Sequence, residues 1–540
     1  MIPMNDSLPT IRINQAGYAE SLPVQVAVLS AGSVIVSDMD GNTIKRVEVN
    51  DLSFDVSSGD NVKVVNLGRL PEGEYTVWCG TESRRISVKK NPWQDITNAL
   101  IKGLYYQRCG CELSEKYAGV YKHPACHTAP STEWENRDIK KTVTGGWHDA
   151  GDYGKYVGPG AVTVAHMLYA YILCGEGCSD ELNIPESGNG VPDILNEARY
   201  ELEWILKMQK DDGSFYHKLT KDHFAPFIMP QDDKDPEYMM PVSHTATGAA
   251  CACLSLASRA YREFDNAFCD SMLNAAIKAY EWLEAGHEFV PFVNPEGVRT
   301  GQYGDKSVTD ELFWASCELY ASTGDKRYLE KAEKLYSDDM NLYSYGWADV
   351  SGLGAICTLF EIREAGGDGL FIRIREKFIE NCKKIAEISE QSGYGTALPE
   401  DSYIWGSILP IMGNAMSLIM YELLTGDESL RPAALLQWNY ALGLNALDIS
   451  FVTGFGKRRV MNIHHRPSGS DGIKEPVPGL ISGGPNKRMT YPGTRERLGD
   501  TPAAKYFLDE LPSADTNEIA IYWNSPAIFT GSFFSLMCGN

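Results

Sequence analysis

The sequence predicts a multidomain protein, with a small all-β immunoglobulin-like sandwich over residues 1–90 and a large all-α domain over residues 91–540. The first segment contains short β-branched or alternating runs between turn residues, which is typical of sandwich strands. Beyond it, the apolar residues recur at helical spacing. Thr-Gly-Asp sequences at 323–325 and 425–427 are typical of the turns that end one helix and begin its partner. Consecutive helical hairpins of this kind would close into an (α/α)6 toroid.

The individual elements follow from these patterns in chain order. The expected strands lie at residues 24–29, 34–36, 62–65 and 74–78. Lysines and a proline at residues 89–92 indicate the linker between the two domains. The expected helices include residues 194–208, 310–315, 329–336 and 415–421.

The composition excludes some classes of partner. The 540 residues include 49 Lys and Arg against 72 Asp and Glu, which gives a net charge of −23. Such a charge repels nucleic acid and anionic lipid, so neither nucleic acid nor a membrane is expected as a partner. Hydrophobic residues make up 43% of the chain, which is enough for a large core and excludes a disordered protein.

Cysteines and targeting signals indicate the compartment. The thirteen cysteines are scattered through apolar segments, so we expect buried thiols in a reducing environment and no disulfide framework. No apolar stretch is expected to be long enough to cross a membrane. The N-terminus shows no signal peptide, which predicts a cytoplasmic protein, or an extracellular one if a signal has been removed.

Two carboxylates three residues apart, Asp149 and Asp152, are the first candidate site residues. They lie in a segment rich in glycine and aromatic residues at positions 145–156. Two acids this close repel each other when both are charged, which is typical of a site that holds a water, a metal or a cationic transition state. The alternative is a glycine-rich surface turn with solvated acids.

Two further segments carry candidate residues. His464, His465 and Arg466 together offer several hydrogen-bond donors for sugar hydroxyls or a carboxylate, although a basic surface loop would have the same composition. Glu518 stands among apolar and aromatic residues, where burial would raise its pKa and keep a proton available near neutral pH. The alternative for Glu518 is a partly buried structural role.

A metal site is the fourth candidate. Two sulfurs and two imidazoles suit tetrahedral zinc, here from Cys109, Cys126, His127 and His148. Such a closed site would be structural, and it would fix the backbone next to Asp149. The spacing also fits two buried thiols and two unrelated histidines, and Cys111 is a spare thiol nearby.

Taken together, these residues resemble glycoside hydrolase family nine, the inverting cellulases, in the subgroup with an N-terminal immunoglobulin-like domain. The resemblance covers nearly the whole chain. It rests on residues 13–18, 106–110, 124–127, 146–153, 229–233, 464–466, 483–486 and 517–520.

The resemblance implies roles for the catalytic residues. Asp152 resembles the general base that activates water, Asp149 the helper that holds the same water, and Glu518 the general acid. His464 and Arg466 resemble ligands of the sugar next to the scissile bond. Further substrate-binding candidates are the aromatic residues Trp405, Tyr153 and Tyr522, with Trp147 and Trp523 as other possible stacking faces. The alternative for each of these aromatic residues is ordinary core packing.

The resemblance also implies the cofactors. It gives structural Zn²⁺ at the Cys/His set and Ca²⁺ at Asp310, Glu311 and Asp349, with no organic cofactor. The alternative for these acids is interaction with a helix N-terminus. The chain departs from the family pattern at four positions expected to line the cleft, namely His244, Ile408, Ala514 and Tyr522.

The predicted function is inverting hydrolysis of β-1,4-glucosidic bonds in cellulose-like glucans or cello-oligosaccharides, as an endoglucanase. One alternative is an exo-acting β-glycosidase of the same family, either an exo-β-glucosaminidase or an exo-hydrolase of cello-oligosaccharides. Another is a non-catalytic carbohydrate-binding protein. The oligomeric state is left open by the sequence.

Overall fold

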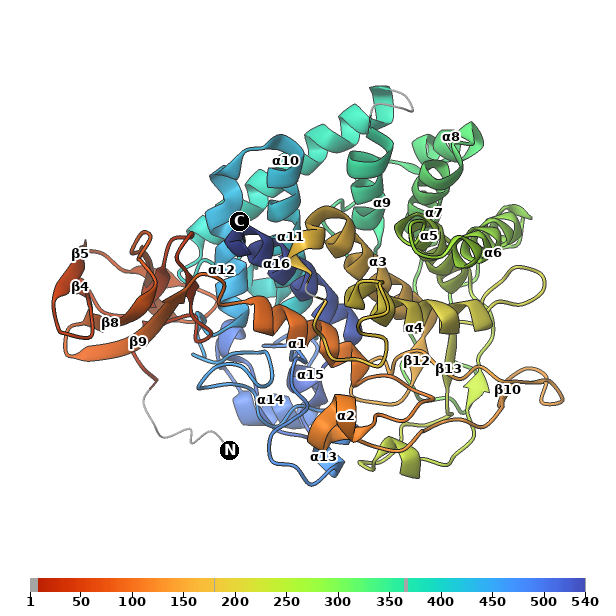
Figure 1. Ribbon diagram of the computed structural model, residues 1–540, viewed down its shortest axis with the longest axis horizontal. Helices are drawn as coiled ribbons and strands as arrows, with labels where there is room; N and C mark the ends of the chain where they lie inside the picture. The colour runs from red at the N-terminus through yellow and green to blue at the C-terminus, as the bar shows by residue number, and fades with distance from the viewer. Residues whose placement is uncertain (1–7, 179, 364–367, 540) are drawn as a thin grey trace. The chain divides into compact units, whose positions relative to one another are not determined.

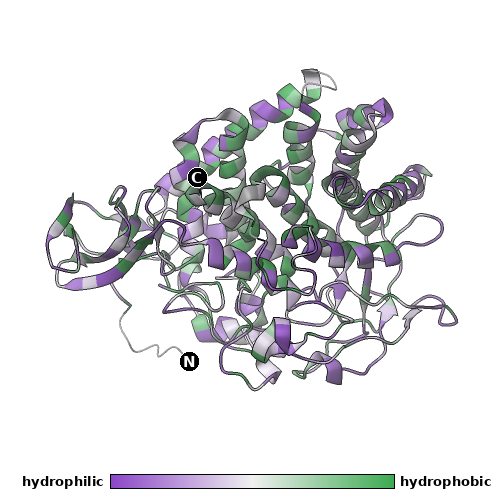
Figure 2. Cartoon of the chain, in the orientation of Figure 1, coloured by the Kyte–Doolittle hydropathy of each residue, from purple (hydrophilic) through white to green (hydrophobic). Residues whose placement is uncertain are grey.

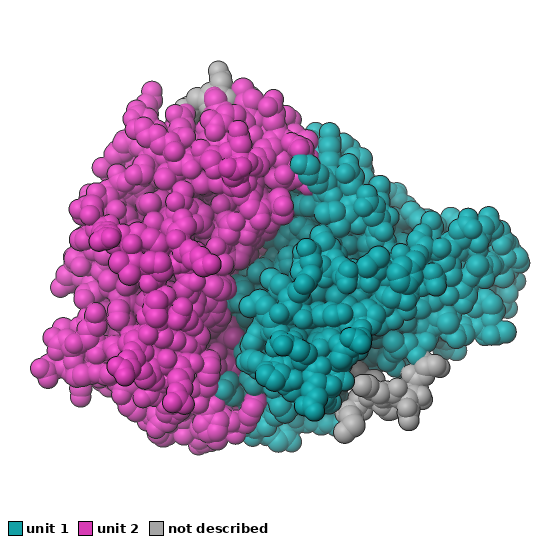
Figure 3. Space-filling view, turned by 180° about the vertical axis from the view of Figure 1, so that it is seen from behind, with its two compact units in different colours: residues 1–103, 174–178, 382–540 teal, residues 104–173, 179–381 magenta. Residues whose placement is uncertain are grey.

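The computed structural model describes residues 8–178, 180–363 and 368–539. Figure 1 shows its helices and strands in chain order. The chain divides into two compact units (Figure 3). Unit 1 comprises Met1–Gly103, Cys174–Cys178 and Cys382–Asn540, and unit 2 comprises Leu104–Leu173 and Ser179–Asn381. The N-terminal strands therefore form a compact unit with the C-terminal helices.

The N-terminal part of unit 1 is a β-sandwich of two sheets. Its strands are β1 (Ile11–Arg12), β2 (Tyr18–Ala19), β3 (Gln25–Val28), β4 (Gly32–Ser37), β5 (Thr43–Val49), β6 (Ser53–Asp55), β7 (Asp60–Asn66), β8 (Gly73–Cys79) and β9 (Glu82–Lys89). The sheets have the orders β1-β3-β7-β6 and β2-β9-β8-β4-β5. All pairs are antiparallel except β2 with β9.

Alternation along the strands builds the core of the sandwich. In β8 the side chains of Tyr75, Val77 and Cys79 are buried, and those between them face outward. Val77 lies opposite Val36 of β4, and both are fully buried. The predicted all-β N-terminal region is thus confirmed.

The rest of unit 1 is helical. Its helices are α1 (Gln94–Tyr105), the end of α10 (Asp368–Gln391), α11 (Ile408–Thr425), α12 (Arg431–Ala441), α13 (Arg466–Ser470), α14 (Pro492–Leu498), α15 (Ala514–Asn517) and α16 (Ile521–Gly539). Helix α11 packs against α12 and α16. It ends at Gly426, whose φ of 73° is the left-handed conformation expected of the glycine in a Thr-Gly-Asp turn.

Unit 2 is built from paired helices. They are α2 (Glu115–Ala118), α3 (Val157–Cys174), α4 (Asp193–Lys207), α5 (His244–Ala260), α6 (Asn266–Glu284), α7 (Thr309–Thr323), α8 (Lys326–Leu335), α9 (Ser351–Cys357) and the first part of α10. Helix α5 packs against α6 and α7, and α7 packs against α8 and α9. These are the consecutive helical pairs that the sequence predicts.

A small sheet that the sequence pattern did not predict also lies in unit 2. Its strands are β10 (Ser131–Glu133), β11 (Lys140–Lys141), β12 (Lys155–Tyr156), β13 (Lys218–Thr220) and β14 (Tyr238–Met239), in the order β11-β10-β14-β13-β12. Strands of two or three residues are too short to show a period of two. Strand β12 directly follows the segment that carries Asp149 and Asp152.

One sequence expectation about apolar segments is wrong. Helices α3 and α11 are each long and apolar enough to cross a membrane. Within the protein, however, 78% of α3 and 67% of α11 are buried, as is typical of core helices. Figure 2 shows such hydrophobic segments along many of the helices.

The cysteines behave largely as expected. All thirteen lie in the described part of the chain, and all are free thiols. Ten are buried, and Cys111, Cys178 and Cys538 are partly exposed.

Polar contacts join the sandwich to the helices of unit 1. Asn14 Nδ2 donates to Asn439 Oδ1 at 2.7 Å, and Arg84 Nη1 donates to Asp448 Oδ2 at 2.9 Å. Gln15 Nε2 donates to the carbonyl of Asp448 at 2.9 Å. The predicted domain boundary at residue 90 falls between β9 and α1, and it stays a prediction because the compact units are divided elsewhere.

Candidate active site and metal centres

The two predicted aspartates of unit 2 lie in a tight, buried turn. The N–H of Asp149 donates to the carbonyl of Gly154 at 2.9 Å, and the N–H of Gly154 donates to Asp152 Oδ2 at 3.1 Å. A Cβ on Gly154 would lie 2.8 Å from the same oxygen, so a larger residue here would displace the Asp152 carboxylate. Asp149 is 1% exposed and Asp152 is 6% exposed. The alternative of solvated surface acids is therefore wrong.

Tyr303 fixes the orientation of Asp149. Its hydroxyl donates to Asp149 Oδ2 at 2.5 Å, and Asp149 Oδ1 is buried without a hydrogen-bond partner among the described residues. Burial raises the pKa of Asp149 well above its ordinary value; the Tyr303 hydrogen bond opposes this, and the charge of Asp152 adds to it. Tyr303 has a φ of 48°, a conformation that costs a non-glycine residue about 1–3 kcal/mol. The surrounding structure thus holds this tyrosine against a local preference.

The four predicted zinc ligands converge in unit 2. One ligand atom from each of Cys109, Cys126, His127 and His148 lies within 4.8 Å of the others. His127 Nδ1 is 3.6 Å from Cys109 Sγ and 3.4 Å from His148 Nε2. Tetrahedral Zn–S and Zn–N bonds of about 2.0–2.3 Å would separate ligand atoms by roughly 3.3–3.8 Å. The donor set therefore fits Zn²⁺, and the reading of unrelated thiols and histidines is wrong.

The carboxylate of Asp233 contacts this cluster through His127. Asp233 Oδ2 lies 3.3 Å from His127 Nε2, and Asp233 also pairs with Lys221. A carboxylate on the far nitrogen of a histidine orients the ring for metal binding. Asp233 belongs to the 229–233 segment that the resemblance includes.

Three acids at the start of α7 form a second possible cation site. Asp305, Asp310 and Glu311 bring carboxylate oxygens within 4.8 Å of one another. Glu311 Oε2 and Asp305 Oδ2 are buried without a hydrogen-bond partner among the described residues. Oxygen donors of this kind suit Ca²⁺. Asp310 and Glu311 also lie in the first turn of α7, so the alternative interaction with the helix N-terminus is compatible with the structure as well.

Asp349 was predicted as the third acid of this group, but the group of three contains Asp305 in its place. Asp349 Oδ1 accepts from the N–H of Ser351 at 3.0 Å. It nevertheless lies near enough for its charge to act on Asp310. Burial, with the Asp349 charge as a smaller cause, raises the pKa of Asp310 to about 6.

In unit 1, Glu518 lies directly after α15 in extended conformation. Its backbone pairs in parallel with His464, and its carbonyl accepts from Gly483 N at 2.8 Å. Trp405 Nε1 donates to Glu518 Oε2 at 3.2 Å. The half-buried carboxyl is therefore fixed both through the backbone and through one of its oxygens.

His464 and Arg466 lie in the same part of unit 1 as Glu518. His464 Nδ1 donates to the carbonyl of Leu511 at 2.7 Å, and burial lowers the pKa of this histidine. Arg466 begins α13 and is 6% exposed, and His465 is 1% exposed. The reading of a basic surface loop is thus wrong, because the segment is largely buried.

The aromatic candidates differ in exposure. Trp405 is partly exposed, whereas Tyr153 and Tyr522 are buried. Trp147 is 1% exposed, and Trp523 packs against Gly406, where an added Cβ would lie 2.5 Å from its ring. Trp147 and Trp523 therefore belong to the core, so their reading as stacking faces is wrong.

The four departures from the family pattern also have defined places. Ile408 is fully buried, and Ala514 and Tyr522 are 7% exposed. His244 begins α5 and packs against the ring of Trp282 at 4.9 Å. The expectation that Ile408 lines the cleft is wrong, because its side chain lies in the core.

Comparison with known proteins decides the family. The model described as glycosyl hydrolase family 9 matches residues 93–530. The chain belongs to glycosyl hydrolase family 9. A relative in this family is the cellodextrinase of Butyrivibrio fibrisolvens, which is 34% identical over 96% of this chain and 98% of its own length.

Solved family 9 structures share the whole fold. A single-mutant form of a thermostable endoglucanase from Alicyclobacillus acidocaldarius has a TM-score of 0.91 at 33% identity, over 98% of this chain and 100% of its own. AaCel9A in complex with cellobiose-like isofagomine has a TM-score of 0.90 at 34% identity, over 97% and 99% of the two chains. These likenesses confirm the predicted fold class of a β-sandwich followed by an all-α domain, and the protein is a glycoside hydrolase.

Proposed function

We propose that Asp152, Asp149 and Glu518 carry out inverting hydrolysis of a β-1,4-glucosidic bond. In this proposal Asp152 takes a proton from water, Asp149 holds that water, and Glu518 protonates the departing oxygen. An inverting enzyme needs one carboxylate as base and one carboxylic acid on opposite faces of the sugar. Sequence resemblance to family 9 assigns these three roles.

The observation that supports the water-holding role is the state of Asp149. Tyr303 occupies one of its oxygens, and the other is buried without a partner among the described residues. An unsatisfied buried carboxylate oxygen costs free energy, so a fold keeps one where a ligand completes it. A water that donates to this oxygen would be oriented for deprotonation by Asp152, three residues away.

On the acid side, the contact of Glu518 with Trp405 serves the proton transfer. The indole N–H donates to Oε2, and a hydrogen bond of this kind stabilises the carboxylate that remains after Glu518 has released its proton. The same contact fixes the carboxyl rotamer, so the proton is delivered from a defined direction.

The substrate is a β-1,4-glucan. Relatives named cellodextrinase and endoglucanase D are 34% and 31% identical over 96% of this chain. A family structure binds a cellobiose-like inhibitor. We propose endo attack on cellulose-like chains. The alternative is exo attack on cello-oligosaccharides or glucosamine oligomers, and analysis of the products distinguishes the two.

The metals in this proposal are structural. Cys109, Cys126, His127 and His148 would hold Zn²⁺ and so fix the backbone at Asp149. The three-acid group with Asp305 would hold Ca²⁺. Neither metal supplies a step of the reaction.

The test is hydrolysis of cellopentaose by Asp152→Asn and Glu518→Gln, with the exposed Asp211→Asn as control. Each of the first two should lower kcat at least about 10²- to 10⁴-fold, because each removes a proton-transfer group. The control should match the wild type. An unchanged rate in either catalytic variant would show that its role is wrong.

Two product measurements complete this test. Proton NMR of fresh product should show the α-anomer, as inversion requires, and a β-anomer would exclude it. Products of several lengths from cellopentaose indicate endo attack, whereas single sugars alone would overturn it. If the wild type binds glucans and cleaves none, the protein is a binding protein.

A further inference from the structure

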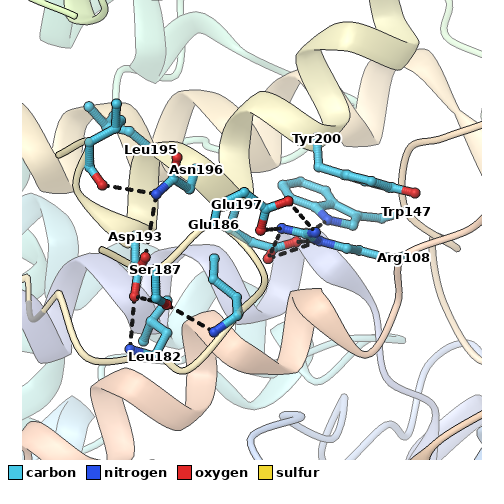
Figure 4. Close-up of polar contacts among 12 residues, drawn as sticks. Arg108, Trp147, Leu182, Glu186, Ser187, Asp193, Leu195, Asn196, Glu197 and Tyr200 are labelled. Carbon is cyan, nitrogen blue, oxygen red and sulfur yellow. Dashed lines mark hydrogen bonds and ion pairs between the residues drawn. The ribbon is translucent and has the colours of Figure 1, made fainter. Parts of the chain in front are cut away.

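A buried ionic cluster lies against the aspartate segment of unit 2. Arg108 Nε and Nη2 donate to Glu197 at 2.9–3.2 Å, and Arg108 Nη1 donates to Glu186 Oε1 at 2.9 Å (Figure 4). Trp147 Nε1 donates to Glu197 Oε1 at 2.8 Å. The side chains of Arg108 and Glu197 are 2% and 0% exposed. The indole of Trp147 and the guanidinium of Arg108 therefore share one buried carboxylate.

The cluster also fixes the backbone of the same segment. Trp147 N donates to Glu201 Oε2 at 2.6 Å, one helical turn beyond Glu197 on α4. Tyr200 stacks on the Arg108 guanidinium at 4.4 Å, and its hydroxyl donates to the carbonyl of Cys109 at 2.6 Å. Helix α4 thus holds Trp147 by both its indole and its backbone, and holds the neighbouring segment at Cys109.

These contacts act at positions next to the reacting groups. Arg108 and Trp147 form an antiparallel bridge, and His148 N donates to Gln107 O at 2.8 Å. Trp147 directly precedes His148 and Asp149. A shift of the Trp147 backbone would therefore be passed to Asp149 over two peptide bonds.

Close packing limits how far this backbone can move. Gly146 has a φ of 72°, and a Cβ there would lie 2.7 Å from Trp204. A Cβ on Gly160 of α3 would collide with Glu201 Oε1. Both glycines leave room for side chains of α4, Trp204 beside the aspartate segment and Glu201 beside α3, which a Cβ at either position would displace.

We infer that Glu197, with Arg108 and Trp147, forms a positioning cluster that sets the place of Asp149 and Asp152 for the reaction. The inference rests on the proposed function of these two aspartates. The three residues act at a distance from the reacting atoms, and their effect passes through the backbone of residues 147–149.

Unit 2 contains a second cluster of the same composition, which serves as a matched control. Glu318 of α7 is buried, pairs with Arg259 and accepts from Trp314 Nε1 at 2.9 Å and from Tyr169 OH at 2.6 Å. All four side chains come from helices of the core, α3, α5 and α7. The catalytic candidates are remote from them in sequence, although Glu311 of the acid group lies one turn before Trp314.

The experiment compares Glu197→Gln with Glu318→Gln, on the full chain with its metals bound. Both variants should lower Tm, because each neutralises a buried partner of an arginine. Only Glu197→Gln should lower kcat on cellopentaose, by about 10- to 100-fold with KM within about twofold, as expected for a misplaced reacting group. Trp147→Phe and its control Trp314→Phe repeat the comparison with one hydrogen bond removed.

Two results would overturn the inference. One is a normal kcat in Glu197→Gln and Trp147→Phe at temperatures where both are folded. The other is an equal loss of kcat in the two variants of each matched pair, which would reflect general loosening. If Asp152→Asn keeps its activity, the proposed function is wrong. If Asp152→Asn loses activity but Glu197→Gln has a normal kcat, only the positioning role is wrong.

Discussion

Two clusters of the same residue types occupy unit 2, and they differ in what they are attached to. In the first, the arginine and the tryptophan come from irregular chain, and helix α4 supplies Glu197, the acid that they share. In the second, arginine, acid and tryptophan all come from helices. The first arginine is 2% exposed, whereas Arg259 is 19% exposed.

The difference shows how irregular chain can be held as firmly as a helix. Residues 144–154 have little backbone hydrogen bonding of a regular kind, so their geometry depends on side chains from elsewhere. The buried carboxyl groups of Glu197 and Glu201 on α4 provide that support. The helical cluster around Glu318 has no such task, because the helices fix their own backbone.

Removing each arginine should give the largest contrast in stability. Arg108→Met leaves the Glu197 carboxylate buried beside the Trp147 indole without its counter-charge, a change that costs about 3–5 kcal/mol. Arg259→Met should cost less, since Arg259 is partly exposed and Glu318 keeps Trp314 and Tyr169. Calorimetry should therefore show the larger fall in Tm for Arg108→Met, and equal falls would contradict the comparison.

Metal removal should act on one cluster only. If the Cys/His set holds structural zinc as proposed, chelation should lower the Tm of the wild type before it lowers specific activity. In Glu197→Gln the further fall should be less than additive, since cluster and metal site share the Arg108–Trp147 bridge, with a coupling of about 0.5–3 kcal/mol. In Glu318→Gln the two effects should add. Elemental analysis that finds no zinc in the purified protein would refute the site.

The smallest contrast concerns pH. Burial raises the pKa of Glu201 from 4.5 to about 8, against the opposing N–H of Trp147 and charge of Lys155. Between these values the folded state binds more protons than the unfolded state, so this residue's contribution to stability is full below pH 4.5 and is lost as the pH rises through 8. Glu201→Gln should flatten the fall of Tm with pH, measured by calorimetry between pH 4.5 and 8. A steeper slope in Glu201→Gln would contradict the assignment.

Local sequence carries part of this structure. Helical periodicity and the Thr-Gly-Asp turns predict the helical pairs, and alternating runs predict the sandwich. The Asp149 segment and the thiol and imidazole set are visible because their residue types are rare and their chemistry is specific. Spacing alone does not show that Cys109 and His148, 39 positions apart, lie close together; the family resemblance implies it.

Other parts of the site leave no local pattern. Tyr303 stands 154 positions from Asp149, and Glu197 stands 89 positions from Arg108. In sequence, Glu197 looks like any helical glutamate, and only the packing of α4 reveals that it is buried. Asp305 can be recognised in the sequence only as an acid shortly before the Asp310–Glu311 pair. Asp349 is an equally plausible third calcium ligand from sequence alone.

The contacts of Asn14, Gln15 and Arg84 attach the N-terminal sandwich to the helical part of unit 1, so the sandwich is an integral part of that unit. Asp448 is fully buried, and its nearest counter-charge is Arg84 from the sandwich. Chimaeras that exchange this sandwich for another immunoglobulin-like module must therefore keep these three side chains. Without Arg84, the buried carboxylate of Asp448 would lose its nearest counter-charge.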